Sequence, residues 1–305
     1  WLAYGLWLAI TWALLLGCLA VLPHLIQEPV PRALIAAAWL VFTPLHLELW
    51  MGQFTFATAA LVFLAVVCWR VGRARTAAAL WAPAAAIKLY PLALVPWLVR
   101  RRRVGALTTG AIVLTAALAW LAWHPDEAEY VWRLNVSEVD LESMHAGNLG
   151  LPALWHALLS LGGAVDAHAF QIGSAVLALG LLALSTVAMV RRGADDRVAA
   201  AVALLLLPLV SKHAWEHHYV VALPAFTLLY AAWRTRPRYV GALALAYMLL
   251  CLPTPLVLLQ EGGPAWHPEQ AWSPIARAGY HAVKPLAALL IHLIAVRELI
   301  RGDQD

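Results

Sequence analysis

One residue that could do chemistry is Lys88, which lies within the apolar run at 84–91. An ammonium group is costly among apolar side chains unless it meets water, a partner or an anion. A lysine can also lay its stem along apolar surface and keep its charge at a membrane interface. A chain turn that ends in Tyr90-Pro91 would instead hold this charge toward a lipid phosphate, and this is the role that we predict for Lys88.

A second polar group interrupts two apolar runs at 211–219, with the sequence Ser-Lys-His-Ala-Trp-Glu-His-His-Tyr. If His213 and His217 share one helix turn, their rings could bind zinc, although the usual His-Glu-x-x-His pattern is absent. The cluster could also be a polar turn that satisfies helix ends. Histidines beside a lysine best suit a phosphate oxyanion, because they can donate hydrogen bonds to a leaving group as it gains charge.

Two shorter patterns carry less information. Residues 48–53 read Glu-Leu-Trp-Met-Gly-Gln, where Gly52 allows a tight turn and Gln53 can bond either backbone or a ligand. Gly147-Asn148 follows an acidic stretch and is equally compatible with ordinary turn chemistry.

The composition determines which elements must position these residues. The 305 residues are 63% hydrophobic and 12% charged, with a mean hydropathy of +0.75, which excludes an ordinary soluble domain. Arginines fall in short clusters between apolar runs, a distribution that orients membrane helices and does not indicate nucleic-acid binding. The three cysteines lie in apolar runs and suggest neither disulfides nor a metal site. The fold class that we predict is an all-α polytopic membrane protein with a single domain over residues 1–305.

The apolar runs predict about nine membrane spans, since each span needs about 20 apolar residues. They lie at 1–22, 33–50, 54–69, 104–123, 168–190, 197–214, 217–233, 238–259 and 281–299. Between the third and fourth spans, residues 77–99 separate two arginine clusters. A re-entrant hairpin that turns near Lys88 would keep both clusters on the cytoplasmic side, as the positive-inside rule prefers.

This topology places the N-terminus outside and the C-terminus inside, so we expect a further span and an external loop before Trp1. Residues 124–150 would then form an external polar loop with six acidic residues, and the apolar piece at 151–161 could lie on the membrane interface. Tryptophans at the predicted outer boundaries are typical of an aromatic belt.

Four patterns in this order resemble glycosyltransferase family 87, the polyprenol-phosphate-dependent enzymes of the GT-C superfamily that include mannosyltransferases. They are Gly52-Gln53, the run 84–88 followed by Pro91, Gly147-Asn148, and Trp215-Glu216-His217-His218. The resemblance covers essentially the whole chain. It implies a GT-C-type helical bundle that moves a sugar, most often mannose, from a polyprenyl phosphate carrier to a hydroxyl of a glycolipid or glycan.

The resemblance also implies roles for individual residues. Lys88, His217 and His218 would hold the donor phosphate, and Trp215 with Glu216 would shape that pocket. Gln53 and Asn148 would line the sugar or acceptor side. The reaction would invert the anomeric centre and would need no nucleotide sugar, cofactor or obligatory metal. The enzyme would lie in the bacterial plasma membrane with its active site on the outer side.

In GT-C enzymes the catalytic aspartate lies in the first external loop. We therefore expect the general base upstream of Trp1, and its identity is unknown from this chain. The acidic residues Asp126, Glu127 and Glu129 are interpreted as a solvated loop surface and not as its replacement.

Two other functions compete with this prediction. In a transporter or flippase, Lys88 and the histidines would bind an anionic lipid-linked substrate during alternating access, although no internal repeat is visible. A non-catalytic scaffold would leave both polar groups without a purpose.

Overall fold

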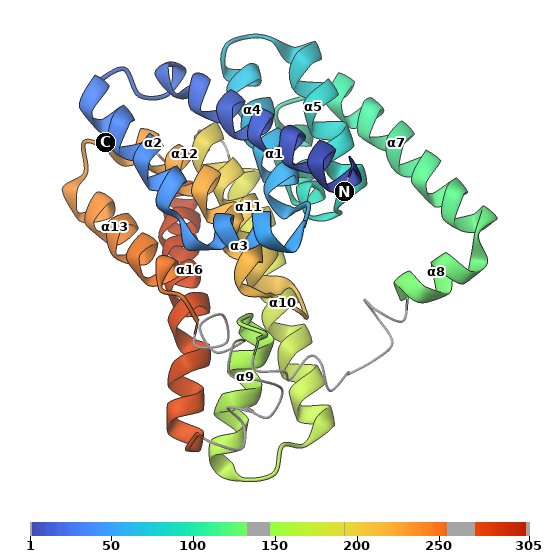
Figure 1. The fold of residues 1–305 in the computed structure, drawn as a ribbon, viewed down its shortest axis with the longest axis vertical. Helices are drawn as coiled ribbons and strands as arrows, with labels where there is room; N and C mark the ends of the chain where they lie inside the picture. Colours follow the sequence, from blue (N-terminus) through green and yellow to red (C-terminus); the bar gives the residue numbers. More distant parts are fainter. Residues whose placement is uncertain (1, 133–146, 192, 255–271, 303–305) are drawn as a thin grey trace.

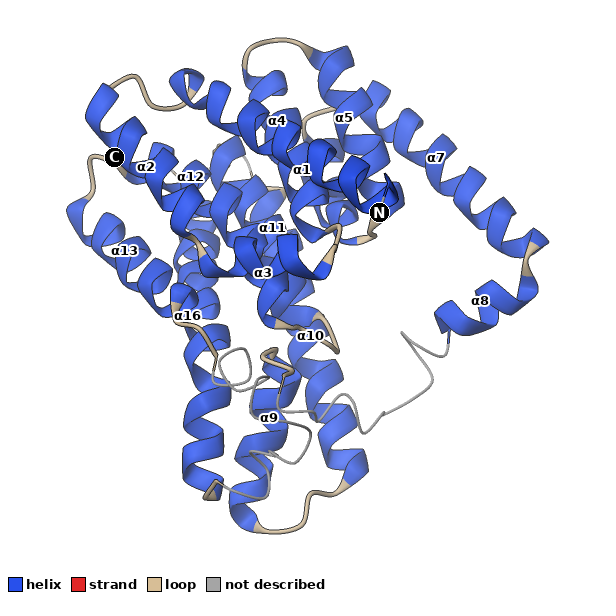
Figure 2. Ribbon diagram, viewed as in Figure 1, coloured by secondary structure: helices blue, strands red, loops and turns tan. Residues whose placement is uncertain are grey.

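The computed structural model describes residues 2–132, 147–191, 193–254 and 272–302, and every element in these ranges is helical (Figures 1 and 2). The α-helices are α1 (Leu2–Ala20), α2 (Pro29–Val41), α3 (Thr43–Met51), α4 (Thr55–Arg70), α5 (Ala74–Ile87), α6 (Val95–Arg100), α7 (Val104–Trp123), α8 (Pro125–Trp132), α9 (Leu151–Leu159), α10 (Ala167–Met189), α11 (Asp196–Val210), α12 (Ala222–Trp233), α13 (Pro237–Cys251) and α16 (Pro274–Arg301). Short 3₁₀ helices include η1 (Leu22–His24), η2 (Tyr90–Leu94), η5 (Ser160–Gly162) and η6 (Glu216–Val221). The all-helical class is confirmed.

Within the described ranges, three helices are long and apolar enough to cross a membrane, namely Leu2–His24, α7 and α10. A fourth is possible if α2 and α3, which meet at a bend of 43°, count as one broken span. The predicted count of about nine spans is therefore not confirmed, because most other predicted spans are helices shorter than about 20 residues. Part of the predicted span at 238–259 lies outside the described residues.

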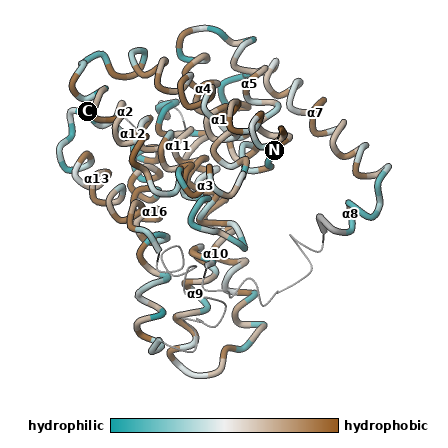
Figure 3. The backbone as a smooth tube through the Cα atoms, in the orientation of Figure 1, coloured by the Kyte–Doolittle hydropathy of each residue, from teal (hydrophilic) through white to brown (hydrophobic). Residues whose placement is uncertain are grey.

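Helix α11 forms the centre of the bundle and packs against α10, α12 and α16. Every residue from Val198 to Leu206 is buried. Four of these are alanines, whose small side chains let neighbouring helices approach closely. Hydrophilic residues gather at helix ends and turns around this apolar centre (Figure 3).

Helices α4, α5 and α7 form a closely packed unit at one side of the molecule. Helix α5 ends because Lys88 is extended, with φ −144° and ψ 141°. The chain then returns through η2 and α6, so that Arg75 and Arg103 line the same pocket. The chain thus reverses near Lys88, as the hairpin prediction requires, and the re-entrant placement of 77–99 in a bilayer stays a prediction.

The predicted external loop at 124–150 begins with α8, and its residues 133–146 lie outside the described residues. The apolar piece at 151–161 is helix α9 followed by η5. Five residues of α9 are buried, and the helix packs against α10 and α16 in the extension at the bottom of Figure 1. This segment therefore packs within the protein, and its position at the membrane interface stays a prediction.

Candidate active site

The turn between α3 and α4 brings polar groups toward the end of α5. Gly52 has φ 68°, a left-handed conformation that favours glycine, and its N–H donates to the Glu48 carbonyl. Gln53 follows, and its own carbonyl accepts a hydrogen bond from Trp7 Nε1 at 3.1 Å. The turn places Thr55, the first residue of α4, against Lys88.

Lys88 is held by this turn. Its Nζ donates to Thr55 Oγ1 at 2.6 Å, and the Tyr90 hydroxyl donates to the Thr55 carbonyl at 3.3 Å. This bond uses one of the three N–H donors of the ammonium group, and no other hydrogen bond from Nζ is found to a described residue.

Glu48 is a carboxylate that the sequence prediction did not include in the site. Its side chain is fully buried, and Oε1 accepts a hydrogen bond from the Phe56 N–H at 2.7 Å. It also interacts with Thr55 and, through its charge, with Lys88. Its Oε2 is buried, and no described residue forms a hydrogen bond with it. A carboxylate flanked by Leu47 and Leu49 was the signal that could have identified Glu48 earlier.

The two histidines come from η6, which packs against α3 and α4. Their ring centroids lie 4.3 Å apart, and Lys88 interacts electrostatically with both. The Trp215 N–H donates to His218 Nδ1 at 2.9 Å, so His218 Nδ1 must be unprotonated and Nε2 carries the proton. His217 is 3% exposed, and its Nδ1 has no hydrogen-bond partner.

Asn148 connects the start of α9 to the segment before η6. Its Oδ1 accepts from the N–H groups of Gly150 at 3.1 Å and Ala214 at 3.0 Å, and its Nδ2 donates to the Lys212 carbonyl at 2.7 Å. The Leu149 N–H adds a bond to the Ala214 carbonyl at 2.7 Å. The side chain of Asn148 is completely buried, so these contacts position the backbone that leads into η6.

Glu216 faces another part of the bundle. Its Oε1 lies 3.1 Å from Lys284 Nζ, and its Oε2 accepts from the Thr254 hydroxyl at 2.6 Å. Lys284 also donates to the carbonyls of Leu250 and Leu252. Through these contacts, Glu216 anchors the start of η6 to Lys284 and Thr254. Its neighbour Trp215 donates its backbone N–H to His218.

The arrangement of Lys88, His217 and His218 offers a cation and imidazole donors, which suit an anion with several oxygen atoms. Among the described residues, no group of three or more His, Cys, Asp or Glu side chains could hold a metal ion.

Residues 1–212 match glycosyltransferase family 87. The chain belongs to this family. The resemblance in the sequence is thereby confirmed, and membership makes the protein a membrane glycosyltransferase, in agreement with its apolar helices. No curated protein and no solved structure matches the chain.

The matched part of this family 87 protein contains Gln53, Lys88 and Asn148, whereas the segment 215–218 lies beyond it. The fold joins the two parts, because η6 packs against α4, whose Thr55 bonds Lys88, and the charge of Lys88 acts on both histidines.

Proposed function

We propose that this family 87 glycosyltransferase moves a sugar, mannose by its resemblance to the family, from a polyprenyl phosphate carrier to a hydroxyl group of a glycolipid or glycan. The observation that carries the proposal is that η6 packs against α4, so that the charge of Lys88, bonded to Thr55, acts on His217 and His218 from a segment about 130 residues away. A membrane transferase with a lipid-phosphate donor needs a site of this charge within an apolar bundle.

In an inverting transfer, the acceptor oxygen bonds to the anomeric carbon while the bond from that carbon to the phosphate oxygen breaks. Polyprenyl phosphate leaves and gains negative charge, and the acceptor hydroxyl loses its proton to a base. The two remaining N–H donors of Lys88 and the Nε2–H of His218 would stabilise this leaving phosphate. The Gln53 side chain, on the turn beside Thr55, would contact the sugar or the acceptor.

The charges at the ends of α5 support a site on the outer side. Arg73 and Arg75 lie at the start of α5, and Lys88 follows its last residue. If the positive-inside rule places the arginine end in the cytoplasm, the Lys88 end points to the outer half of the membrane.

The test is transfer in vesicles by the enzyme expressed from its complete gene, with synthetic polyprenyl phosphate mannose as donor and a bacterial glycolipid extract as acceptor. Lys88→Met and His218→Ala should each reduce product formation by roughly 100-fold, the cost of removing one donor to a developing anion. Thermal melting of both variants should show that they still fold.

His24→Ala is the matched control, because His24 is exposed at the end of η1. Its transfer rate should equal that of the original chain. Full turnover by both site variants would refute the proposal, and movement of labelled donor across the vesicle membrane without a new glycosidic bond would favour a transporter or flippase.

A further inference from the structure

A second polar site lies at the arginine end of the α5–α7 unit. A pocket of about 460 Å³ opens between the end of α4, the start of α5 and the start of α7. Its lining includes Trp69, Arg75, Arg102, Arg103 and Thr109. Three guanidinium-bearing residues from two separate segments therefore converge on one pocket.

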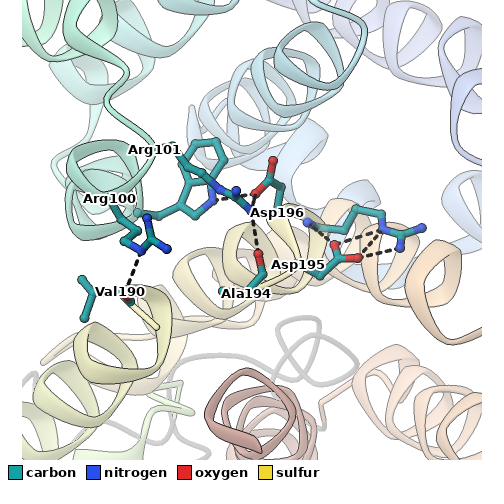
Figure 4. Close-up of polar contacts among 8 residues, drawn as sticks. Arg100, Arg101, Val190, Ala194, Asp195 and Asp196 are labelled. Atoms are coloured by element: carbon teal, nitrogen blue, oxygen red, sulfur yellow. Dashed lines mark hydrogen bonds and ion pairs between the residues drawn. The ribbon is translucent and has the colours of Figure 1, made fainter. Parts of the chain in front are cut away.

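These arginines differ in their partners from two arginines nearby, Arg101 and Arg197, which are paired with carboxylates. Arg101 pairs with Asp196 at 2.6 Å, and Arg197 pairs with Asp195 at 2.6 Å (Figure 4). Within the part of the chain that the structure describes, no carboxylate lies within ion-pair distance of the three pocket arginines. Among the described residues, no acceptor bonds the buried Nε of Arg103, so this donor can bond an anion that enters the pocket.

The backbone favours the same charge. The pocket lining includes the first residues of α7, whose N-cap residue Arg103 provides no side-chain cap. Val104 and Ala106 already donate their N–H groups to the carbonyls of Arg102 and Arg103, so the contribution of α7 is the positive end of its helix dipole, which favours an anion. Arg102 is the one non-glycine residue with positive φ, 52°, among those described, and such conformations persist where the surroundings impose them.

The pocket lies beside a helix whose apolar side chains are exposed, as contact with lipid requires. Helix α7 is a candidate membrane span of which only 11% is buried, and Val104 and Ile112 are 67% and 64% exposed. An acyl chain can therefore follow α7 directly from the pocket. We propose that this pocket binds the phosphate headgroup of an anionic membrane lipid, with its acyl chains along α7.

This lipid site is separate from the donor site. Lys88 lies at the opposite end of α5, and the 14 residues of this helix span about 20 Å. The proposal does not depend on the transferase proposal, because loss of Lys88 should leave lipid binding at the arginines intact.

The experiment uses the full chain in nanodiscs of phosphatidylcholine that contain a minor fraction of phosphatidylglycerol. The protein is released from the nanodiscs, and native mass spectrometry counts the phosphatidylglycerol molecules that stay bound to it. The variant Arg75→Gln/Arg102→Gln/Arg103→Gln should retain phosphatidylglycerol roughly tenfold less than the original chain, since each basic residue contributes to binding of anionic headgroups.

The control variant Arg32→Gln/Arg191→Gln/Arg238→Gln loses the same charge outside the pocket and should retain the lipid fully. If both variants lose the same amount of bound phosphatidylglycerol, the loss comes from general surface charge and the proposal is overturned. Displacement of phosphatidylglycerol by inorganic phosphate at equal affinity would also overturn it, because the site would then recognise a free phosphate. Retention by the pocket variant of as much lipid as the original chain would refute it directly.

Discussion

At the scale of single residues, Thr55 explains how a lysine is oriented beside apolar helices. Its hydroxyl oxygen accepts from Lys88 at 2.6 Å, and its carbonyl accepts from Tyr90. Glu48 lies behind it and bonds the Phe56 N–H. The ammonium group therefore has a defined direction before any ligand arrives, which lowers the entropic cost of binding.

Thr55→Val should test this positioning role, because valine keeps the shape of threonine and removes its oxygen. Lys88 would lose one acceptor, so we expect roughly tenfold lower kcat/KM, about 1.4 kcal/mol, mainly through a higher KM for the donor. Steady-state kinetics with varied donor measures both constants.

Thr58→Val is the matched control on the same helix. Thr58 is equally buried, but its hydroxyl donates to the Phe54 carbonyl one turn back and does not contact Lys88. Equal kinetic effects of the two valine variants would mean that the loss at Thr55 comes from helix packing.

At the scale of elements, the start of α11 is joined to its neighbours through charged groups. The Asp195 carboxylate caps the helix by accepting from the Arg197 N–H at 2.7 Å, and Arg197 also donates to the Ala231 carbonyl at the end of α12. Asp196 accepts from Arg101 and from Trp97 of α6 (Figure 4). These contacts hold the arginine ends of α6, α11 and α12 together.

Partial burial raises the pKa of Asp195, but the hydrogen bonds and charge of Arg197 outweigh this and leave that pKa below its ordinary value. A carboxylate with a lowered folded-state pKa stabilises the fold above its unfolded pKa of about 3.9, and this contribution disappears as the pH falls through the folded pKa. Asp195→Asn should thus reduce stability by about 1 kcal/mol at neutral pH and by progressively less below pH of about 4. Melting curves over this range measure the difference.

The same substitution in an Arg197→Gln background is the control. Without the guanidinium, Asp195→Asn should reduce the stability at neutral pH much less. If it reduces the stability by the same amount in both backgrounds, the helix cap and not the ion pair provides the stability.

At the scale of the whole molecule, the site depends on contacts between distant parts of the chain. Asn148 links the start of α9 to the segment before η6, and His281 of α16 bonds the Asn148 carbonyl at 3.0 Å. The ion pair of Glu216 and Lys284 joins η6 to α16, and both side chains are 3% exposed. The position of His217 and His218 is therefore set by the packing of α9 and α16 as well as by η6.

Breaking this pair should destabilise the protein. Glu216→Gln or Lys284→Met alone would leave one buried charge without its partner, at a cost of roughly 3 kcal/mol. The double variant should lose much less than the sum of the two single losses, because neither charge remains. Thermal melting in detergent gives all three values, and simple additivity would show that the two groups do not stabilise each other.

The sequence alone determined the helical membrane class and pointed to several candidate site residues. A mean hydropathy of +0.75 leaves few other fold classes, and Lys88 stands out because a charge within an apolar run is costly wherever it lies. The histidine cluster was visible for the same reason. These signals are local, so they can be read before the chain is folded.

Only the tertiary structure decided which of these residues act together. Three sets of contacts join residues that are far apart in sequence. They are Glu48 with Lys88, Asn148 with the segment at 212–214, and Glu216 with Lys284. The number of spanning helices also depended on where bends and turns shorten apolar runs. Such contacts arise from helix packing, whose energy is shared among many side chains and leaves no local pattern in the sequence.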